Sequence, residues 1–528
     1  MTVHEVTLNL LRSLGMTTLF GNPGSTELPL LSNLPADFRY ILGLQEAVVV
    51  GMADGYAQAT GRAAFVNLHS AAGLGNALGN IYTAFENQTP LVITAGQQSR
   101  ALQPHYPYLY APNAAEFPRP WVKWSCEPAR GEDVPAALER AWHIAMQRPC
   151  GPTFVSIPMD DWKAPACPRP VRVTAFDYAP DPASLARIAD ALNRSERPVF
   201  VVGPAVDRDD MWAAMVALAE RTKAAVWASP VSPRAGFPEE HPLFAGFLPP
   251  APGPLADILN QHDFVLVLGS PVFTYHVPGE VRTDSTRLHL ITDDQAAAAR
   301  APVAVTVLSS MRLALPALLE LTLPVDRIQP AARLQPPLPR SGDPIAAELV
   351  MATLRKVLPD NGVIVEEAPS HRKAMRDYLP IRQRGGFHDG ASGGLGFAMP
   401  AAVGMALAEG GRPIVCLIGD GSAMYSIQAL WTAAQRGARV TFLVLNNRSY
   451  AVMKALAAVL KTPNPAGVEL PGLDFVTIAR GMGCPADRVV QSAGLEAALT
   501  RALAAEGPFL LEIEVDPSFG IPYGLAGE

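Results

Sequence analysis

The chain has 528 residues, which is too long for a single hydrophobic core and predicts two to four domains. Apolar residues make up 49% of the chain and charged residues 17%, a balance that excludes extended disorder. The net charge is −7 and no long basic run is present, so we expect no nucleic-acid partner.

The cysteines and the apolar segments restrict the cellular setting. The five cysteines are odd in number, widely spaced and without a CxxC pair, which argues against a disulfide framework or a structural zinc site. No basic signal-peptide start is seen, and no uncharged apolar run reaches the roughly 18–20 residues that span a bilayer. We therefore expect a cytoplasmic protein with no membrane partner.

Short apolar runs rich in β-branched residues alternate with amphipathic helical patterns along the whole chain. Such runs are typical of strands buried on both faces, and the helices between them predict parallel sheets built from βαβ units. The clearest runs are 18–20, 64–68, 91–95, 199–202, 264–268, 414–418 and 440–445. The sequence therefore predicts an α/β fold.

Two proline-rich stretches, 165–182 and 324–344, interrupt this alternation. Segments of this composition are typical of extended linkers. They predict three α/β domains with central parallel sheets, covering residues 1–180, 181–335 and 336–528.

The first group of candidate functional residues lies near the amino end. Residues 21–27, GNPGSTE, follow the first predicted strand, and His69 ends the second. Between them Glu46 is surrounded by apolar neighbours, where a carboxylate needs a partner. Either Glu46 is catalytic, or it is a first-turn glutamate stabilised by the dipole of its helix. His69 could likewise be a strand-end histidine bonded to backbone.

The strongest motif lies near the carboxyl end. The strand predicted at 414–418 runs into GDGS at 419–422, a helix is expected at roughly 427–435, and the strand predicted at 441–445 ends in Asn446-Asn447. Glycines let a phosphate approach the backbone amides, and side chains at the carboxyl ends of parallel strands meet at one edge of the sheet. Asp420 and Asn447 offer hard oxygen ligands, which suit Mg²⁺ or Ca²⁺ bound to a diphosphate. The alternative is a plain strand–turn–helix with a loop asparagine pair.

Together these motifs resemble the thiamine-diphosphate-dependent 2-oxo-acid decarboxylases, and among them the benzoylformate branch. The resemblance covers essentially the whole chain, and it is most specific in residues 20–75, 95–98, 118–124, 269–276 and 391–400. His69 is followed by Ser70 rather than by a second histidine, which favours that branch. The resemblance implies an N-terminal pyrimidine-binding domain, a central Rossmann-like domain and a C-terminal diphosphate-binding domain.

The resemblance also implies roles for individual residues. Glu46 would activate the cofactor, Ser25 would hydrogen-bond the substrate, and His69 and His276 would move protons. Thiamine diphosphate would contact a larger set: Glu46, Pro369, Ser370, Gly393, Leu395, Gly419, Asp420, Gly421, Ser422, Asn447, Ser449 and Tyr450. The metal, Mg²⁺ or Ca²⁺, would be held by Asp420, Asn447 and the backbone carbonyl of Ser449. His276 could instead be a surface-loop histidine, and Leu395 an ordinary core leucine.

The implied reaction is the non-oxidative decarboxylation of a benzoylformate-like 2-oxo acid to an aldehyde and CO₂, which makes the chain a carboxy-lyase. The alternative is a carboligase or lyase that uses the same cofactor, like acetolactate synthase or benzaldehyde lyase, although no flavin signature is found in the central region. In this family the two cofactor-binding domains of one site come from different subunits. A homodimer or homotetramer with active sites between subunits is therefore implied.

Several pocket positions depart from the family pattern. Pro369, Arg372, Asp389 and Leu456 stand where the family has Ser, Thr or aromatic residues, and His105-Tyr106 fill a loop that is otherwise apolar. If these side chains line the substrate cavity, we expect it to be more polar than a cavity built for a phenyl ring. Arg372 could either pair with Asp389 or bind an anionic or hydroxylated tail of the substrate.

Overall fold

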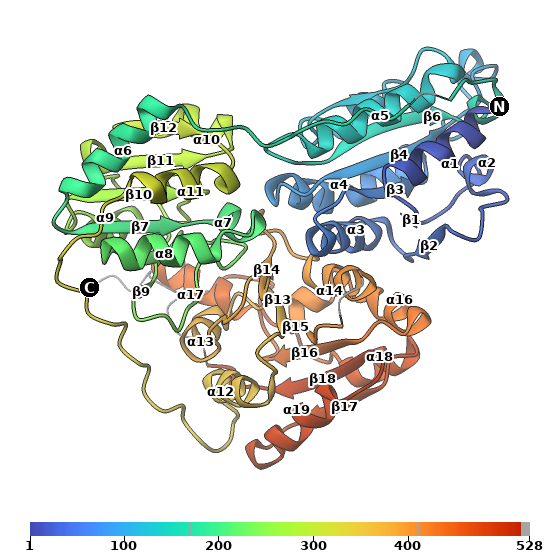
Figure 1. Ribbon diagram of the computed structural model, residues 1–528. Helices are drawn as coiled ribbons and strands as arrows, with labels where there is room; N and C mark the ends of the chain where they lie inside the picture. Colours follow the sequence, from blue (N-terminus) through green and yellow to red (C-terminus); the bar gives the residue numbers. More distant parts are fainter. Residues whose placement is uncertain (169, 409–410, 519–528) are drawn as a thin grey trace.

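Three parallel sheets, each flanked by helices, organise the chain (Figure 1). The computed structural model describes residues 1–168, 170–408 and 411–518, and within them each sheet has six strands. The α/β fold predicted from the alternating pattern is confirmed, and the seven runs lie in strands whose ends agree within two residues.

The N-terminal sheet has the strand order β2-β1-β3-β4-β6-β5. Its strands are β1 (Thr18–Gly21), β2 (Arg39–Leu42), β3 (Ala64–Leu68), β4 (Leu91–Gln97), β5 (Ser125–Cys126) and β6 (Thr153–Pro158). Its α-helices are α1 (Val3–Ser13), α2 (Leu28–Leu31), α3 (Glu46–Thr60), α4 (Ser70–Glu86) and α5 (Val134–Met146).

The central sheet has the strand order β12-β11-β10-β7-β8-β9. Its strands are β7 (Pro198–Val202), β8 (Ala225–Ala228), β9 (Phe244–Phe247), β10 (Phe264–Leu268), β11 (Leu288–Thr292) and β12 (Val305–Leu308). Its α-helices are α6 (Pro182–Arg194), α7 (Pro204–Arg208), α8 (Trp212–Thr222), α9 (Pro252–Leu259), α10 (Gln295–Arg300) and α11 (Met311–Leu321).

The C-terminal sheet has the strand order β14-β13-β15-β16-β18-β17. Its strands are β13 (Val363–Glu367), β14 (Phe387–Asp389), β15 (Ile414–Gly419), β16 (Val440–Asn446), β17 (Ala486–Val489) and β18 (Phe509–Glu514). Its α-helices are α12 (Ala347–Val357), α13 (Arg372–Tyr378), α14 (Ala398–Leu407), α15 (Asp420–Ala423), α16 (Ala429–Arg436), α17 (Ala451–Val459), α18 (Phe475–Gly481) and α19 (Leu495–Leu503).

The two proline-rich stretches lie between the sheets. Residues 170–181 and 322–346 contain no helix or strand, and Figure 1 shows the second as a long extended trace beside the C-terminal sheet. Each predicted domain range therefore contains one sheet, while the boundaries at 180/181 and 335/336 stay a prediction.

Helices α3 and α14 join the N-terminal and C-terminal sheets. A Cβ atom at Gly55 would collide with the backbone of Ala401, and one at Gly404 would collide with the backbone of Met52. Only glycine allows two helix backbones to approach this closely. Apolar residues of both helices belong to one buried cluster, so the two cofactor-type regions of one chain share a hydrophobic core.

The helix expected at 427–435 is present as α16, but it begins two residues later because residues 424–428 form turns. In the GDGS segment, Asp420 already begins the short helix α15. Among the described residues, the helices are too short or too polar to cross a membrane.

Candidate functional site

Glu46 is the first residue of α3 and is buried, with 8% of its surface exposed. The amide of Asn22 donates to its Oε1 at 3.3 Å, and the amide of Asn76 donates to its Oε2 at 3.1 Å. Glu46 thus lies in the first turn of a helix, as the alternative of a dipole-stabilised glutamate requires. However, two amide partners in an apolar setting also fix the carboxyl group in one orientation, as a catalytic acid needs.

His69 is held by a buried carboxylate that the sequence interpretation gave no role. Glu27 accepts a hydrogen bond from His69 Nδ1 at 2.8 Å and further bonds from the backbone amides of Gly24 and Gly96. A Cβ atom at Gly24 would collide with the imidazole ring, so glycine is required there. Glu27 is the one charged residue of the segment 21–27, and that was the signal that could have identified it.

The backbone after His69 is unusual. Ser70 has φ of 47°, in the left-handed region that non-glycine residues seldom adopt, and its hydroxyl is buried without a hydrogen-bond partner among the described residues. Strain of this kind is often found at functional sites. At Ser70 the chain turns from β3 into α4, directly beside His69.

Ser25 and His276 are both exposed and lie in loops. Ser25 belongs to the segment after β1, close in sequence to Glu27. His276 belongs to the segment after β10, where its backbone amide donates to the carbonyl of Pro250 at 2.8 Å. Neither side chain has a hydrogen-bond or ion-pair partner among the described residues, so their participation in the site stays a prediction.

Asp420 and Asn447 follow neighbouring parallel strands, β15 and β16. The side chain of Asn447 accepts a hydrogen bond from the amide of Ser449 at 3.1 Å. Arg448 between them has φ of 60°, which bends the chain back toward Asn447. The three expected metal ligands are therefore brought to one edge of the sheet.

The donor set fits a small hard cation. Asp420 Oδ1 accepts the amide of Gly421 at 2.7 Å, but its buried Oδ2 has no hydrogen-bond partner among the described residues. Burial raises the pKa of Asp420 to about 6, which a bound cation would reverse. The described residues contain no cluster of three or more His, Cys, Asp or Glu side chains that could hold a metal ion. The expected ligands instead combine one carboxylate with an amide and a backbone carbonyl, which is chemistry that Mg²⁺ and Ca²⁺ accept.

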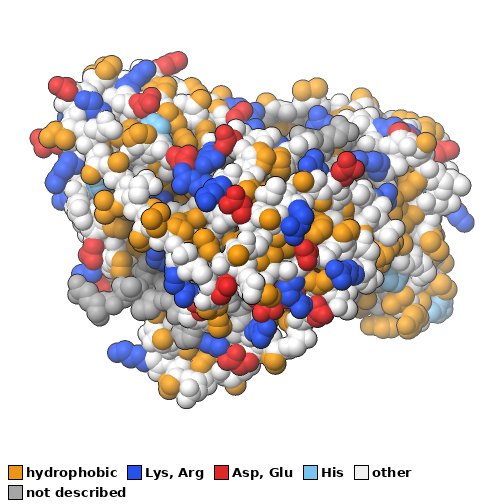
Figure 2. Space-filling view, turned by 90° about the horizontal axis from the view of Figure 1, so that it is seen from below, with side chains coloured by type: hydrophobic (Ala, Val, Ile, Leu, Met, Phe, Trp, Pro, Cys, Tyr) orange, Lys and Arg blue, Asp and Glu red, His pale blue; other side chains and the backbone are white. Residues whose placement is uncertain are grey.

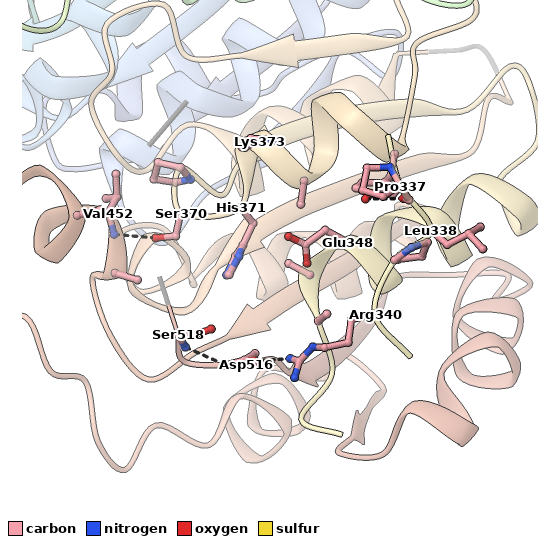
Figure 3. Close-up of a pocket in the computed structure, with 18 residues that line it drawn as sticks. Pro337, Leu338, Arg340, Glu348, Ser370, His371, Lys373, Val452, Asp516 and Ser518 are labelled. Carbon is pink, nitrogen blue, oxygen red and sulfur yellow. Dashed lines mark hydrogen bonds and ion pairs between the residues drawn. The ribbon is translucent and has the colours of Figure 1, made fainter. Parts of the chain in front are cut away.

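A cavity of about 590 Å³ lies beside these residues (Figure 3). Pro369 and Ser370, expected to contact the cofactor, line it together with the first turns of α17. The amide of Val452 donates to Ser370 Oγ at 3.0 Å, as Figure 3 shows. His371, next in the chain, lies 3.5 Å from the side-chain amide of Asn447. Sequence reasoning gave His371 no role.

The loop before α14 carries Gly393 and Leu395. Leu395 is half-buried and lies outside the buried core, so its burial does not support the alternative of a core leucine. The amide of Asn80 donates to the carbonyls of Ala47 and Gly396, at 2.6 and 3.2 Å. Asn80 thereby ties this loop to the start of α3.

Arg372 forms ion pairs with Asp389 and Glu366, each at 2.6 Å from Nη2. Of the two alternatives for Arg372, the structure therefore shows the first, pairing with Asp389. Burial raises the pKa of Asp389 to about 7, and the charge of Arg372 opposes that rise. His105 and Tyr106 are exposed and Leu456 is half-buried.

The candidate residues thus form two groups within one chain. Glu46 and His69 bind partners in the N-terminal region, whereas Asp420 and Asn447 bind partners in the C-terminal region. Remaining cofactor candidates of the second group, Gly419, Gly421, Ser422 and Tyr450, lie on the same sheet edge, at the end of β15 and the start of α17.

Three family models match the chain. They are the thiamine pyrophosphate enzyme N-terminal TPP binding domain at residues 1–114, the central domain at 185–318 and the C-terminal TPP binding domain at 368–513.

Individual proteins match over nearly the full length. Benzoylformate decarboxylase of Pseudomonas aeruginosa is 43% identical over 97% of this chain and 98% of its own. The crystal structure of benzoylformate decarboxylase from Polynucleobacter necessarius has a TM-score of 0.96 and 39% identity, covering 98% of this chain and 99% of its own. A thiamine diphosphate-dependent 4-hydroxybenzoylformate decarboxylase from Rhodococcus jostii has a TM-score of 0.94 and 40% identity, covering 98% and 100%. Acetolactate synthase large subunits match at lower identity, 26% over 94% of this chain for the Escherichia coli isozyme 3 subunit, with 92% of that subunit covered.

Proposed function

This chain belongs to the thiamine pyrophosphate enzyme family, and on that premise we propose that it decarboxylates a benzoylformate-like 2-oxo acid to an aldehyde and CO₂ without oxidation. The observation that carries the proposal is the 43% identity to benzoylformate decarboxylase over nearly the whole of both chains. When bound, thiamine diphosphate supplies an electron sink for the pair released with CO₂.

Glu46 is proposed to act at the pyrimidine end of the cofactor. Its carboxyl group is buried at the start of α3 and oriented by Asn22 and Asn76, so it can hold or release a proton at a fixed position. Leu395, half-buried beside Gly393 and Gly396, is proposed to support the bent shape of the cofactor.

Mg²⁺, or Ca²⁺, is proposed to be held by Asp420, Asn447 and the carbonyl oxygen of Ser449. Oδ2 of Asp420, which has no hydrogen-bond partner in the described part of the chain, supports this assignment, because a buried carboxylate oxygen without a donor is otherwise costly. Gly419, Gly421, Ser422, Tyr450, Pro369 and Ser370 are proposed to surround the diphosphate.

Ser25, His69 and His276 are proposed to act on the substrate. Ser25 would hydrogen-bond the carboxylate or ketone oxygen, and the two histidines would donate and accept protons as CO₂ leaves and the aldehyde forms. Glu27 is proposed as a positioning residue, since its bond to Nδ1 of His69 leaves Nε2 for the substrate.

A complete site is proposed to need a second copy of the chain, in a homodimer or homotetramer. Supporting this, the hydrogen bonds to Glu46 and His69 come from the N-terminal region, and those to Asp420 and Asn447 come from the C-terminal region. Large apolar side chains are also exposed close in sequence to both groups, among them Leu28, Tyr425 and Met453. The cytoplasmic location expected from the sequence stays a prediction.

A panel of 2-oxo acids tests the proposal. The purified protein, loaded with thiamine diphosphate and Mg²⁺, should release CO₂ and benzaldehyde from benzoylformate faster than it releases CO₂ from pyruvate. Addition of a second aldehyde tests the carboligase alternative: if hydroxyketone becomes the main product at the expense of free aldehyde, the decarboxylase assignment is wrong. Light scattering after chromatography, with and without the cofactor, tests the dimer or tetramer.

A further inference from the structure

The end of β13 carries a buried acid that the proposed function gives no role. Glu367 is the last residue of this strand, and 4% of its surface is exposed. On the face of the molecule in Figure 2, acidic side chains lie among basic ones. Glu367 differs from these surface acids, because no basic side chain in the described part of the chain forms an ion pair with it. Arg372 pairs with Glu366 and Asp389 instead.

Three backbone amides bind Glu367 in place of a basic partner. The amide of Gly396 donates to Oε1, and the amides of Phe397 and Ala398 donate to Oε2, each at 2.8 Å. These amides belong to the start of α14, and the N-terminus of a helix favours an acid. The carboxyl group of Glu367 therefore attaches the first turn of α14 to the end of β13.

The cap that Glu367 gives to α14 is not a local one. A helix is ordinarily capped by the side chain of the residue just before it, but Phe397 at this position forms no such bond. The capping carboxyl group comes instead from a residue 29 to 31 positions earlier in the chain. A cap from so far away fixes the distance between two segments in addition to satisfying the amides.

One of the two segments is the loop that carries Leu395. Gly396, the next residue, is bound at both of its polar groups: its amide donates to Glu367, and its carbonyl accepts from the side-chain amide of Asn80 at 3.2 Å. Its φ of 105° lies in a region that residues with side chains rarely adopt. These bonds restrict the backbone from which the half-buried side chain of Leu395 extends.

The other segment belongs to the strand ends of the C-terminal sheet. Pro369 and Ser370, two of the proposed cofactor contacts, follow Glu367 closely in the chain. Glu367 also pairs with Ile418 across the sheet, and Gly419 comes directly after Ile418. The carboxyl group of Glu367 thus connects the Leu395 loop to the edge of the sheet that is proposed to surround the diphosphate.

Stability alone does not explain an acid at this position. Burial raises the pKa of Glu367 from 4.5 to about 8, the three amides oppose that rise, and the charge of Asp389 adds to it. An acid whose pKa is raised by folding contributes less to the free energy of unfolding as the pH rises from about 4.5 to about 8. The position that Glu367 gives to the three amides accounts better for the arrangement.

We propose that Glu367 is a positioning residue for the decarboxylation, which sets the place of Leu395 by binding the amides of residues 396–398. The proposal rests on the proposed function, in which Leu395 supports the bent shape of the cofactor. That shape brings the pyrimidine ring close to the C2 proton of the thiazolium ring, which leaves at the start of the reaction. A displacement of about 1 Å can lower a rate by about 100-fold, so loss of the three bonds should slow the release of this proton.

Amide hydrogen exchange in the cofactor-free protein tests the three bonds themselves. Glu367→Gln keeps the shape of the side chain but turns an NH₂ group toward one or two of the amides, so we expect the amides of residues 396–398 to exchange about tenfold faster or more. The matched control is Asp474→Asn. Asp474 is an exposed acid that accepts the amide of Thr477 in the first turn of α18, and its variant should leave exchange at residues 396–398 unchanged. Wild-type exchange in Glu367→Gln would overturn the proposal.

Exchange of the C2 proton of the bound cofactor for deuterium tests the positioning of Leu395. NMR measures it with thiamine diphosphate and Mg²⁺ saturating and without substrate, and the rate is expressed per bound cofactor. We expect it to be about 10- to 100-fold slower in Glu367→Gln and in Leu395→Ala. The double variant should be no slower than Leu395→Ala, because both changes act through one side chain. Additive losses, or wild-type C2 exchange in Glu367→Gln, would overturn the proposal.

Two further variants keep the outcomes separate. Glu367→Asp retains the acid but ends one methylene short of the amides, so it tests the same distance if Glu367→Gln does not fold. If Leu395→Ala exchanges like the wild type, Leu395 has no role in the proposed function and this inference falls with it. Neither measurement uses a 2-oxo acid, so a failure of the decarboxylase assignment leaves both results interpretable.

Discussion

The two halves of the candidate site differ in how far the chain completes them. At the amino half, both oxygens of Glu46 accept hydrogen bonds from side-chain amides, and His69 is held by Glu27. At the carboxyl half, Asp420 leaves one buried oxygen without a partner among the described residues. The difference is consistent with the proposed roles, in which protein groups preorganise Glu46 and His69 for proton transfer and Asp420 binds a cation.

The largest expected effect is at the amino half. Glu46→Gln keeps the shape and both amide neighbours but removes the ionisable group, so we expect kcat to fall by about 10³-fold. Cofactor affinity should change little by comparison. Steady-state decarboxylation and cofactor titration on the same preparation check this, and wild-type turnover with cofactor bound would remove Glu46 from the mechanism.

The carboxyl half should respond in affinity instead. Asp420→Asn keeps one oxygen but loses the negative charge, so we expect thiamine diphosphate to bind about 100-fold more weakly in the presence of Mg²⁺. Raising Mg²⁺ should restore part of the activity. Calorimetry at several Mg²⁺ concentrations measures the effect, with Asp487→Asn, an exposed acid of the same region, as the control. Equal affinity in wild type and variant would contradict the assignment.

A smaller effect on kcat is expected for Glu27, the residue that holds His69. Glu27→Gln should lower kcat by about 10- to 100-fold through misplacement of His69, while KM changes little. A merely structural role would lower the amount of folded enzyme but leave kcat per folded active site unchanged. Steady-state rates normalised to the amount of bound cofactor separate these outcomes.

The smallest expected effect concerns the stability of the cofactor-free protein. Burial raises the pKa of Asp420 from 3.8 to about 6, so the folded chain binds a proton more tightly than the unfolded chain. The contribution of Asp420 to the free energy of unfolding is fully present below pH 4. It falls by about 1–3 kcal/mol as the pH rises to about 6. Asp420→Asn should therefore unfold at a higher temperature than the wild type above pH 6 and at a similar one near pH 4. Thermal unfolding of both proteins across this range provides the test.

The buried strands and the cation ligands were accessible from the sequence because their signals are local. Continuous apolar runs marked seven strands, and the GDGS and Asn-Asn segments follow two of those strands directly. Short or edge strands such as β5 and β14 carry no such pattern and were not identified. Their existence depends on pairing with neighbours far away in the sequence.

The partners of individual side chains were less accessible. The sequence left two alternatives for Arg372, and only the fold shows that Asp389, seventeen positions later on the next strand, lies within ion-pair distance. Glu27 and Asn76 were missed for the same reason, because their contacts cross from one strand end or helix to another. The role of His276 remains a prediction from resemblance, since its side chain has no hydrogen-bond partner in the described part of the chain.

The backbone contact of α3 with α14 at Gly55 and Gly404 sets a limit on how this chain could be redesigned. A methyl group added at either glycine would push the two helices apart. Both Glu46 and Leu395 would then be displaced, although neither residue had been substituted. Substitutions that widen the choice of substrate are therefore expected in the loops at the strand ends. The contact between α3 and α14 should tolerate almost none.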